Sequence, residues 1–224
     1  MDLASETPFP CAGDGPNFYI GRLGKGLSAN MDYFNVNTAK AVGKAHTFAV
    51  WVLEGPGSRP SGDDPEYWGF LQGNTFMSAW SENQDLVGGQ TLFADIEPGS
   101  GGWTLGNYDE NTATLFGFLN VVTSGNSGNQ TGGVYISQDY WNGYFGSNYV
   151  SQIPIVVWAA GSNCPDGCVA AADEFNASYA NMVIGGYYVS IWQYYPTACG
   201  GNRDLDITPH AGYQTSKWEP LPAI

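Results

Sequence analysis

Six short runs of β-branched and aromatic residues recur along the chain, and each predicts a buried strand. Most of these runs are apolar throughout and do not alternate between apolar and polar positions. Continuous apolarity is typical of parallel strands that are buried on both faces of a sheet. The predicted strands cover residues 17–21, 47–53, 91–96, 133–137, 154–159 and 188–194.

Several intervals between these runs have the spacing of apolar residues that is typical of helices. The clearest helix is predicted over residues 31–45, with Gly43 marking its end. A second is predicted over residues 66–83. A third begins near Asp109, whose carboxylate can cap and complement a helix N-terminus, and it extends through residue 123.

The order of strands and helices predicts an α/β fold, a TIM-barrel-like and irregular barrel, in a single domain over residues 1–224. Weaker strand signals at residues 1–4 and 204–207 bring the number of strands to eight, which would let the sheet close. A Gly- and Asn-rich loop is expected from residue 125 to residue 132. The long loop 55–65 is expected at the rim of the barrel, as a candidate lid.

The charge of the chain excludes several kinds of partner. Its 21 acidic and 7 basic residues give a formal net charge of −14, so no field attracts nucleic acid or anionic membranes. No run approaches the ~20 apolar residues of a membrane span, and no leader pattern opens the chain. The low content of charged residues, 12%, together with 31 Gly, favours an extracellular protein. We expect a secreted monomer without a cofactor.

Cysteine and histidine usage favours disulfides over a metal site. Four cysteines suit two disulfides in an oxidising compartment, and all three pairings remain open. A zinc site would need further ligands, but His46 and His210 lie far away in sequence, so no metal is expected. The chain has no Gly-x-Ser-x-Gly motif, so neither histidine points to a Ser-His-Asp hydrolase. The cysteines are Cys11, Cys164, Cys168 and Cys199.

Two carboxylates follow the apolar run at residues 91–96. Asp95 and Glu97 are two residues apart, so in a strand their side chains point to the same face, and Pro98 ends that strand. The carboxyl ends of barrel strands form the active-site rim. Paired acids there suit glycoside cleavage, in which one is protonated and the other is charged. The alternative is that Asp95 caps a turn and Glu97 is solvated.

Other predicted strand ends carry groups that suit a sugar. Aromatic faces pack against pyranose rings, while amides and carboxylates bind hydroxyl groups by directed hydrogen bonds. For each aromatic side chain the alternative is a place in the core. The candidate substrate-binding residues are Glu54, Tyr135, Trp158, Trp192 and Gln193.

The order of these motifs resembles a known family. After Asp95-Ile96-Glu97 come Gly133-Val134-Tyr135, Val157-Trp158-Ala159, Ile191-Trp192-Gln193-Tyr194 and Asp204-Leu205-Asp206. This series resembles the lysozyme-type muramidases of glycoside hydrolase family twenty-five. The first third is more similar to related secreted glycoside-hydrolase-like domains of unknown function, through Met1-Asp2-Leu3-Ala4, Phe18-Tyr19-Ile20-Gly21-Arg22 and Lys25-Gly26-Leu27-Ser28.

The resemblance implies an irregular α/β barrel in which four carboxylates converge, those of Asp2, Asp95, Glu97 and Asp204. Asp206 is a second candidate for the last of these positions and a candidate substrate-binding residue. By the same resemblance Glu97 is the general acid, and Asp95 stabilises developing positive charge or orients a neighbouring group of the substrate. The acids on the first and last strands then tune those pKa values and position water.

These observations predict a secreted glycosidase that cleaves a cell-wall-type polysaccharide, with peptidoglycan as the first candidate. The alternative is a non-catalytic glycan-binding or surface protein on the same barrel, because fold alone does not guarantee turnover. A Glu97 carboxylate held by Arg22, Arg59 or Arg203 would favour the alternative. A general acid and an acidic surface together predict best activity below neutral pH.

Overall fold

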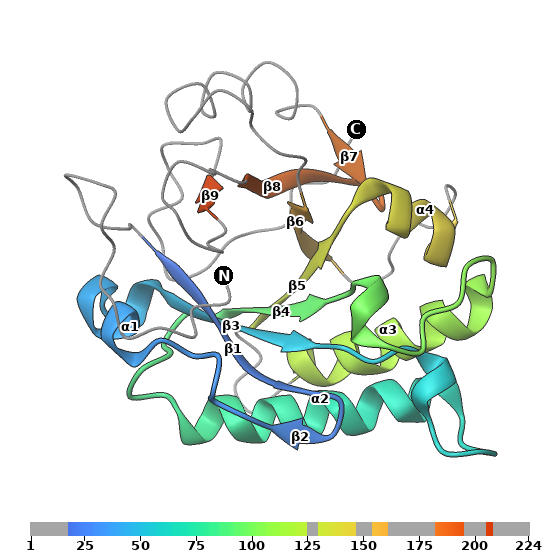
Figure 1. Cartoon of the computed structure of the whole chain (residues 1–224), viewed down its shortest axis with the longest axis horizontal. Coiled ribbons are helices and arrows are strands. Elements are labelled where there is room, and N and C mark those ends of the chain that lie inside the picture. Colours follow the sequence, from blue (N-terminus) through green and yellow to red (C-terminus); the bar gives the residue numbers. More distant parts are fainter. Residues whose placement is uncertain (1–17, 125–129, 147–153, 161–181, 195–204, 208–224) are drawn as a thin grey trace.

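The computed structural model describes residues 18–124, 130–146, 154–160, 182–194 and 205–207. Six strands form a continuous parallel sheet in the order β1, β3, β4, β5, β6, β8. The sheet curves from β1 through β4 and β5 to β8 (Figure 1). These strands are β1 (Tyr19–Lys25), β3 (Thr47–Val52), β4 (Thr91–Asp95), β5 (Thr131–Ile136), β6 (Ile155–Ala160) and β8 (Tyr187–Tyr194). The six predicted strands are therefore confirmed, with boundaries shifted by a few residues.

Three short antiparallel strands complete the sheet: β2 (Ser28–Ala29), β7 (Val183–Ile184) and β9 (Leu205–Ile207). β7 and β8 are joined by the two-residue turn Gly185-Gly186, both with positive φ, a conformation that favours glycine. β9 confirms the predicted strand at residues 204–207, and it pairs with β8. Within the described part of the chain, no ladder joins β9 to β1. The predicted strand at residues 1–4 lies outside the described residues.

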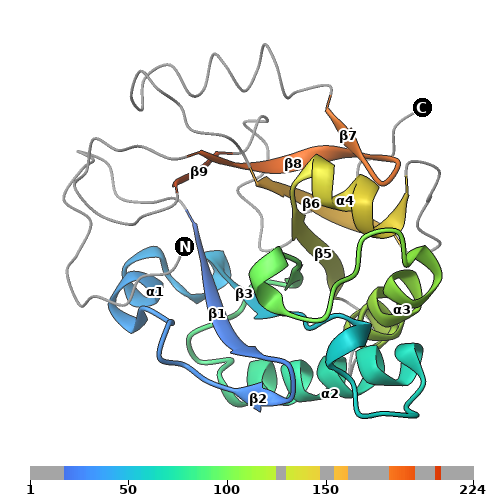
Figure 2. The same ribbon diagram turned by 45° about the vertical axis from the view of Figure 1, so that its right-hand side comes forward.

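The helices lie on the outer face of the curved sheet (Figure 2). α2 (Pro65–Glu82) begins where the Asp64 carboxylate accepts a hydrogen bond from the Tyr67 N–H, with proline at its first position. α3 (Tyr108–Ser124) packs along it, and both match the predicted helices. The other helices are α1 (Val36–Val42), α4 (Gln138–Phe145) and the 3-10 turns η1 (Lys44–His46), η2 (Pro56–Ser58) and η3 (Pro98–Ser100).

The prediction for residues 31–45 is wrong in its first part. The Asn35 side chain accepts a hydrogen bond from the Thr38 N–H and so caps a helix that begins only at Val36. Before it, the chain makes a turn in which the Asn30 side chain accepts a hydrogen bond from the Asp32 N–H. Gly43 ends the helix, as predicted. α4 was not predicted, and the Ser137 hydroxyl caps it.

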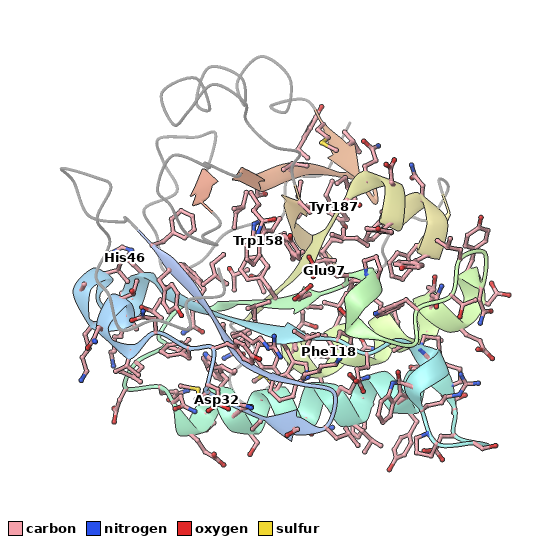
Figure 3. All side chains as sticks on the ribbon, in the orientation of Figure 1. Asp32, His46, Glu97, Phe118, Trp158 and Tyr187 are labelled. Carbon is pink, nitrogen blue, oxygen red and sulfur yellow. The ribbon has the colours of Figure 1, made fainter. Side chains whose placement is uncertain are left out.

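Apolar side chains pack on both faces of the sheet, which explains the continuous apolar runs. The larger cluster lies between the strands and the helices and includes Trp51, Phe76 and Phe118. In Figure 3, Phe118 lies on the side of the sheet that faces α2 and α3, whereas Trp158 lies on the other side. The inner cluster contains Ile20, Phe48, Val50, Phe93, Tyr135, Val156, Trp158 and Ile191.

Candidate active site at the carboxyl ends of the strands

A row of four residues crosses the inner face of the sheet near the carboxyl ends of β3 to β6. The strand register pairs Val52 with Asp95, Asp95 with Tyr135, and Tyr135 with Trp158. Tyr135 and Trp158 belong to the inner cluster, and Asp95 lies two residues beyond Phe93 of the same cluster. Because side chains alternate between the faces of a strand, Asp95 is directed to the inner face as well. The half-buried Asp95 thus has aromatic neighbours inside the barrel.

The segment after β4 carries Glu97 to the surface beside Asp95. Ile96 is fully buried in the outer cluster, and its N–H donates to the carbonyl oxygen of Tyr135 at 3.0 Å. The strand alternation therefore persists past the end of β4, which leaves Glu97 exposed on the same side as Asp95. Glu97 lies on the same side of β4 as Trp158 in Figure 3. This arrangement fits the sequence-based expectation of two acids on one face.

Ser100 fastens the turn that follows the two acids, and the sequence analysis missed it. Its side chain is only 2% exposed. The Ser100 hydroxyl accepts a hydrogen bond from the Glu97 N–H at 3.0 Å and donates to the carbonyl oxygen of Asp95 at 3.5 Å. The Ser100 N–H in turn donates to the Glu97 carbonyl oxygen. A serine three residues after Glu97, with Pro98 between them, is the signal that could have revealed this turn.

Tyr135, Trp158 and Gln193 form the inner wall beside Asp95. The Tyr135 hydroxyl donates to the Gln193 side-chain oxygen, a bond that joins β5 to β8 across β6. The ring centroids of Tyr135 and Trp158 are 4.5 Å apart. The Phe93 ring packs edge-to-face with Trp158, with centroids 5.6 Å apart. Tyr135 is 7% exposed and Trp158 is 2% exposed. The structure therefore brings these three predicted residues together, as packed and mutually bonded groups.

Glu54 lies at the rim, directly after β3. Its carboxylate is 3.6 Å from the Lys25 ammonium group at the end of β1. Its backbone is held by the buried Gln72, whose side-chain amide accepts from the Glu54 N–H at 2.8 Å and donates to the Glu54 carbonyl oxygen at 2.9 Å. An anionic and a cationic group thus lie together at the end of the strand that neighbours Asp95.

Loop 55–65 is held against the segment that follows η3. The N–H groups of Gly55 and Gly57 donate to the carbonyl oxygens of Gly101 and Gly102 at 2.8 and 2.9 Å. A Cβ atom on Gly55 would lie 2.6 Å from the Gly102 backbone, so this contact requires glycine. The loop therefore forms a docked wall of the rim, which is not the arrangement expected of a lid.

Arg59 secures the same loop by an ion pair with Glu110 of α3. The Arg59 guanidinium donates to both carboxylate oxygens of Glu110, at 3.2 and 3.1 Å. Hydrogen bonds from Arg59 and Asn107 hold the pKa of the Glu110 carboxyl below its ordinary value. Arg22 lies over the ring of Tyr33, 4.3 Å from its centroid. Arg59 and Arg22 thus have partners in Glu110 and Tyr33; Arg203 lies outside the described residues.

The structure separates His46 from the two acids. His46 is in η1, which precedes β3, whereas Asp95 is paired with Val52 at the other end of that strand. Within the described residues, no group of three or more His, Cys, Asp or Glu side chains could hold a metal ion. No helix in the described ranges is long and apolar enough to cross a membrane.

Several predicted site residues lie beyond what the structure describes. Asp2, Asp204 and the four cysteines are outside the described residues. The strand register places Trp192 opposite Ala159 and places Asp206 opposite Gln193. The backbone of Asp206 is therefore paired with that of Gln193, a residue of the inner wall.

No protein-family model and no curated protein sequence matches the chain. Solved structures do share its architecture. A GH25 lysozyme from Aspergillus fumigatus aligns with a TM-score of 0.57 and 18% identity, over 89% of this chain and 86% of that one. The chain has the fold of the GH25 lysozymes. A muramidase from Trichobolus zukalii aligns with a TM-score of 0.51 and 17% identity, over 88% of this chain and 84% of the other.

The GH25 lysozyme fold confirms the irregular α/β barrel expected from the sequence, and it spans nearly the whole chain. The comparison also agrees with the family resemblance of the strand-end motifs. At this level of identity the similarity establishes the fold alone.

Proposed function

We propose that this protein is a glycoside hydrolase that cleaves a cell-wall-type polysaccharide. The observation that carries the proposal is the position of Asp95 and Glu97, on one face at the carboxyl end of β4 in a GH25 lysozyme fold. The names of the structural neighbours, a lysozyme and a muramidase, make peptidoglycan the first candidate substrate. The proposed protein is a secreted monomer that requires no cofactor.

In the proposed reaction Glu97 is the general acid. Its proton moves to the glycosidic oxygen as the bond from that oxygen to the anomeric carbon breaks. Asp95 stabilises the positive charge that develops on the sugar, either directly or by orienting a neighbouring group of the substrate. A water molecule supplies the hydroxyl group to the anomeric carbon, and its remaining proton returns to a carboxylate.

The environments of the two acids suit this division of roles. Asp95 is half-buried beside Tyr135, within the fixed geometry of β4, whereas Glu97 is exposed and its side chain takes part in a capping box with Ser100 at the start of η3. Asp2 and Asp204, with Asp206 as the alternative for the last position, are proposed to tune the two pKa values and position water. Glu54, Trp192 and Gln193 are proposed to contact the sugars together with the ring edges of Tyr135 and Trp158.

One observation favours a second candidate, a glycan-binding protein without turnover. The inner wall is filled by its own side chains, because Tyr135 is bonded to Gln193 and Trp158 is packed against Phe93. These contacts leave little room for a sugar between the described side chains of this wall. Such a surface can bind a glycan without cleaving it.

The deciding experiment is the release of reducing ends from purified peptidoglycan and other cell-wall polysaccharides between pH 4 and 7. We expect Glu97→Gln to lower kcat by at least about 100-fold, because general acid catalysis contributes ~10²–10⁴-fold. We expect a loss of similar order for Asp95→Asn, because the charge that stabilises the transition state is removed.

A matched control is Glu82→Gln, which neutralises an exposed carboxylate at the end of α2. It should keep wild-type activity, and all variants should keep the wild-type Tm. Binding of a polysaccharide by the wild type without release of reducing ends would replace the hydrolase with the glycan-binding protein.

A further inference from the structure

Three exposed apolar side chains form a row beside α4: Tyr140 of α4 itself, Leu105, and Tyr108 at the start of α3. Tyr140 is in the first turn of α4, Gly143 follows three residues later on the neighbouring face, and Gly146 is the cap residue that follows the helix. Leu105 lies over Gly143, and Tyr108 lies over Gly146. The exposed fractions are 37% for Tyr140, 67% for Leu105 and 46% for Tyr108.

Gly143 allows Leu105 to lie close to α4. A Cβ atom on Gly143 would lie 2.6 Å from Cδ2 of Leu105, whereas one on Gly146 would be in ordinary contact with the Tyr108 ring at 3.8 Å. The Gly106 N–H also donates to the Gly143 carbonyl oxygen at 2.8 Å. The segment before α3 is therefore fixed against α4, and Figure 2 shows the two side by side.

The Tyr140 ring is held in its orientation by the neighbouring Tyr144 ring. Its ring stacks on Tyr144 with centroids 5.6 Å apart and an angle of 13° between the planes. Tyr144 is buried and contacts Trp103, with ring centroids 5.8 Å apart. One face of Tyr140 is thus covered by a rigid partner, while the side chain as a whole stays accessible. A preoriented aromatic ring loses little conformational entropy when a ligand packs on it.

Two residues of the row follow the two acids closely in the chain. Leu105 and Tyr108 belong to the segment that starts at Glu97, and Trp103 in the same segment donates its indole N–H to the Leu53 carbonyl oxygen at 2.9 Å. That oxygen lies at the end of β3, one residue before Glu54. This hydrogen bond fixes the segment between Glu97 and Leu105 beside the end of β3.

We propose that Tyr140, Leu105 and Tyr108 bind an uncharged stretch of a glycan strand next to the proposed cleavage site. The inference rests on the proposed function for its ligand class. Exposed tyrosine and leucine side chains offer apolar surface to the C–H faces of sugar rings. Asp109 and Asp139, next in sequence to Tyr108 and Tyr140, are exposed and add negative charge to this part of the surface, which repels anionic polymers.

The test measures binding in the Glu97→Gln background, so that turnover plays no part. Retention on insoluble chitin and on peptidoglycan is compared between this parent and the parent carrying Tyr140→Ala and Tyr108→Ala. We expect about 10-fold weaker binding to at least one polymer, because the double variant removes both aromatic rings of the row. The matched control carries Tyr67→Ala and Phe70→Ala, which remove another exposed, stacked aromatic pair on α2. It should bind as the parent does.

A second variant, Leu105→Asp, keeps the tyrosines and adds a charge to the most exposed position of the row; it should weaken binding similarly without lowering Tm. Equal binding by the row variants and the control, or no binding of either polymer by the parent, overturns the inference. Binding that depends on the row, in a protein that releases no reducing ends, upholds it and refutes the hydrolase. If the row substitutions are made in the active protein and the polymers are cleaved with an unchanged KM, the proposed hydrolase is supported and the proposed binding role of the row is refuted.

Discussion

At the scale of single residues, Ser100 fixes the backbone from which the two proposed catalytic side chains, Asp95 and Glu97, project. It bonds the backbone on both sides of Ile96, at the Asp95 carbonyl oxygen and at the Glu97 N–H. The recorded bonds of its hydroxyl are to backbone groups, so we assign Ser100 a positioning role. Loss of its hydroxyl leaves the Glu97 N–H without this acceptor, at a cost of about 1–3 kcal/mol.

We expect Ser100→Ala to lower kcat for polysaccharide hydrolysis by about 10- to 100-fold and to leave KM nearly unchanged, because small misplacements of catalytic groups are expensive. Ser100→Thr, which retains a hydroxyl group, should recover part of the loss. The control is Thr114→Val, which removes a buried hydroxyl that donates to the Pro65 carbonyl oxygen far from the acids. A comparable fall of kcat in that control would mean that general destabilisation, not positioning, explains the effect.

At the scale of elements, glycines on α2 and α3 allow the two helices to pack backbone against backbone. A Cβ atom on Gly69 would lie 1.9 Å from the Thr114 carbonyl oxygen, and one on Gly117 would lie 2.0 Å from the Glu66 carbonyl oxygen. Neither oxygen can move without moving its helix. This close pair covers the outer face of the strands that carry Asp95 and Glu54.

We therefore expect Gly117→Ala to lower the free energy of unfolding by about 2 kcal/mol or more, because the helices must separate. Gly99→Ala is the control, since a Cβ atom there meets no heavy atom within 4 Å. It should change stability by less than about 0.5 kcal/mol. Urea unfolding of both variants measures the difference, and equal midpoints would contradict the close helix contact.

At the scale of the whole molecule, net charge and the proposed general acid act in the same direction. The formal charge of −14 becomes smaller as carboxylates are protonated at low pH, which reduces repulsion of anionic cell-wall polymers. A general acid must also be protonated to work. Activity on peptidoglycan should therefore be greatest below pH 7, and a pH profile of kcat/KM that peaks clearly above 7 would contradict this. Added salt should raise activity most on anionic cell-wall polymers, because it screens their repulsion from the negatively charged protein.

Local sequence patterns determined the strands of the barrel and the placement of Asp95 and Glu97 on one face. These features depend on periods of two and on continuous apolarity, which short segments show by themselves. The same reasoning failed at the start of α1, where the Asn35 cap outweighed helix-like spacing, and it missed α4.

Only the tertiary structure decided which distant groups meet. Tyr135 bonds Gln193 across 58 residues, Arg59 pairs with Glu110 across 51, and Leu105 lies on Gly143. No local pattern encodes such partners, because strand register and helix packing bring them together only once the core has formed. The sequence thus determined the carboxylates and the barrel that carries them, whereas packing decided the filled inner wall, the Ser100 turn and the exposed row beside α4.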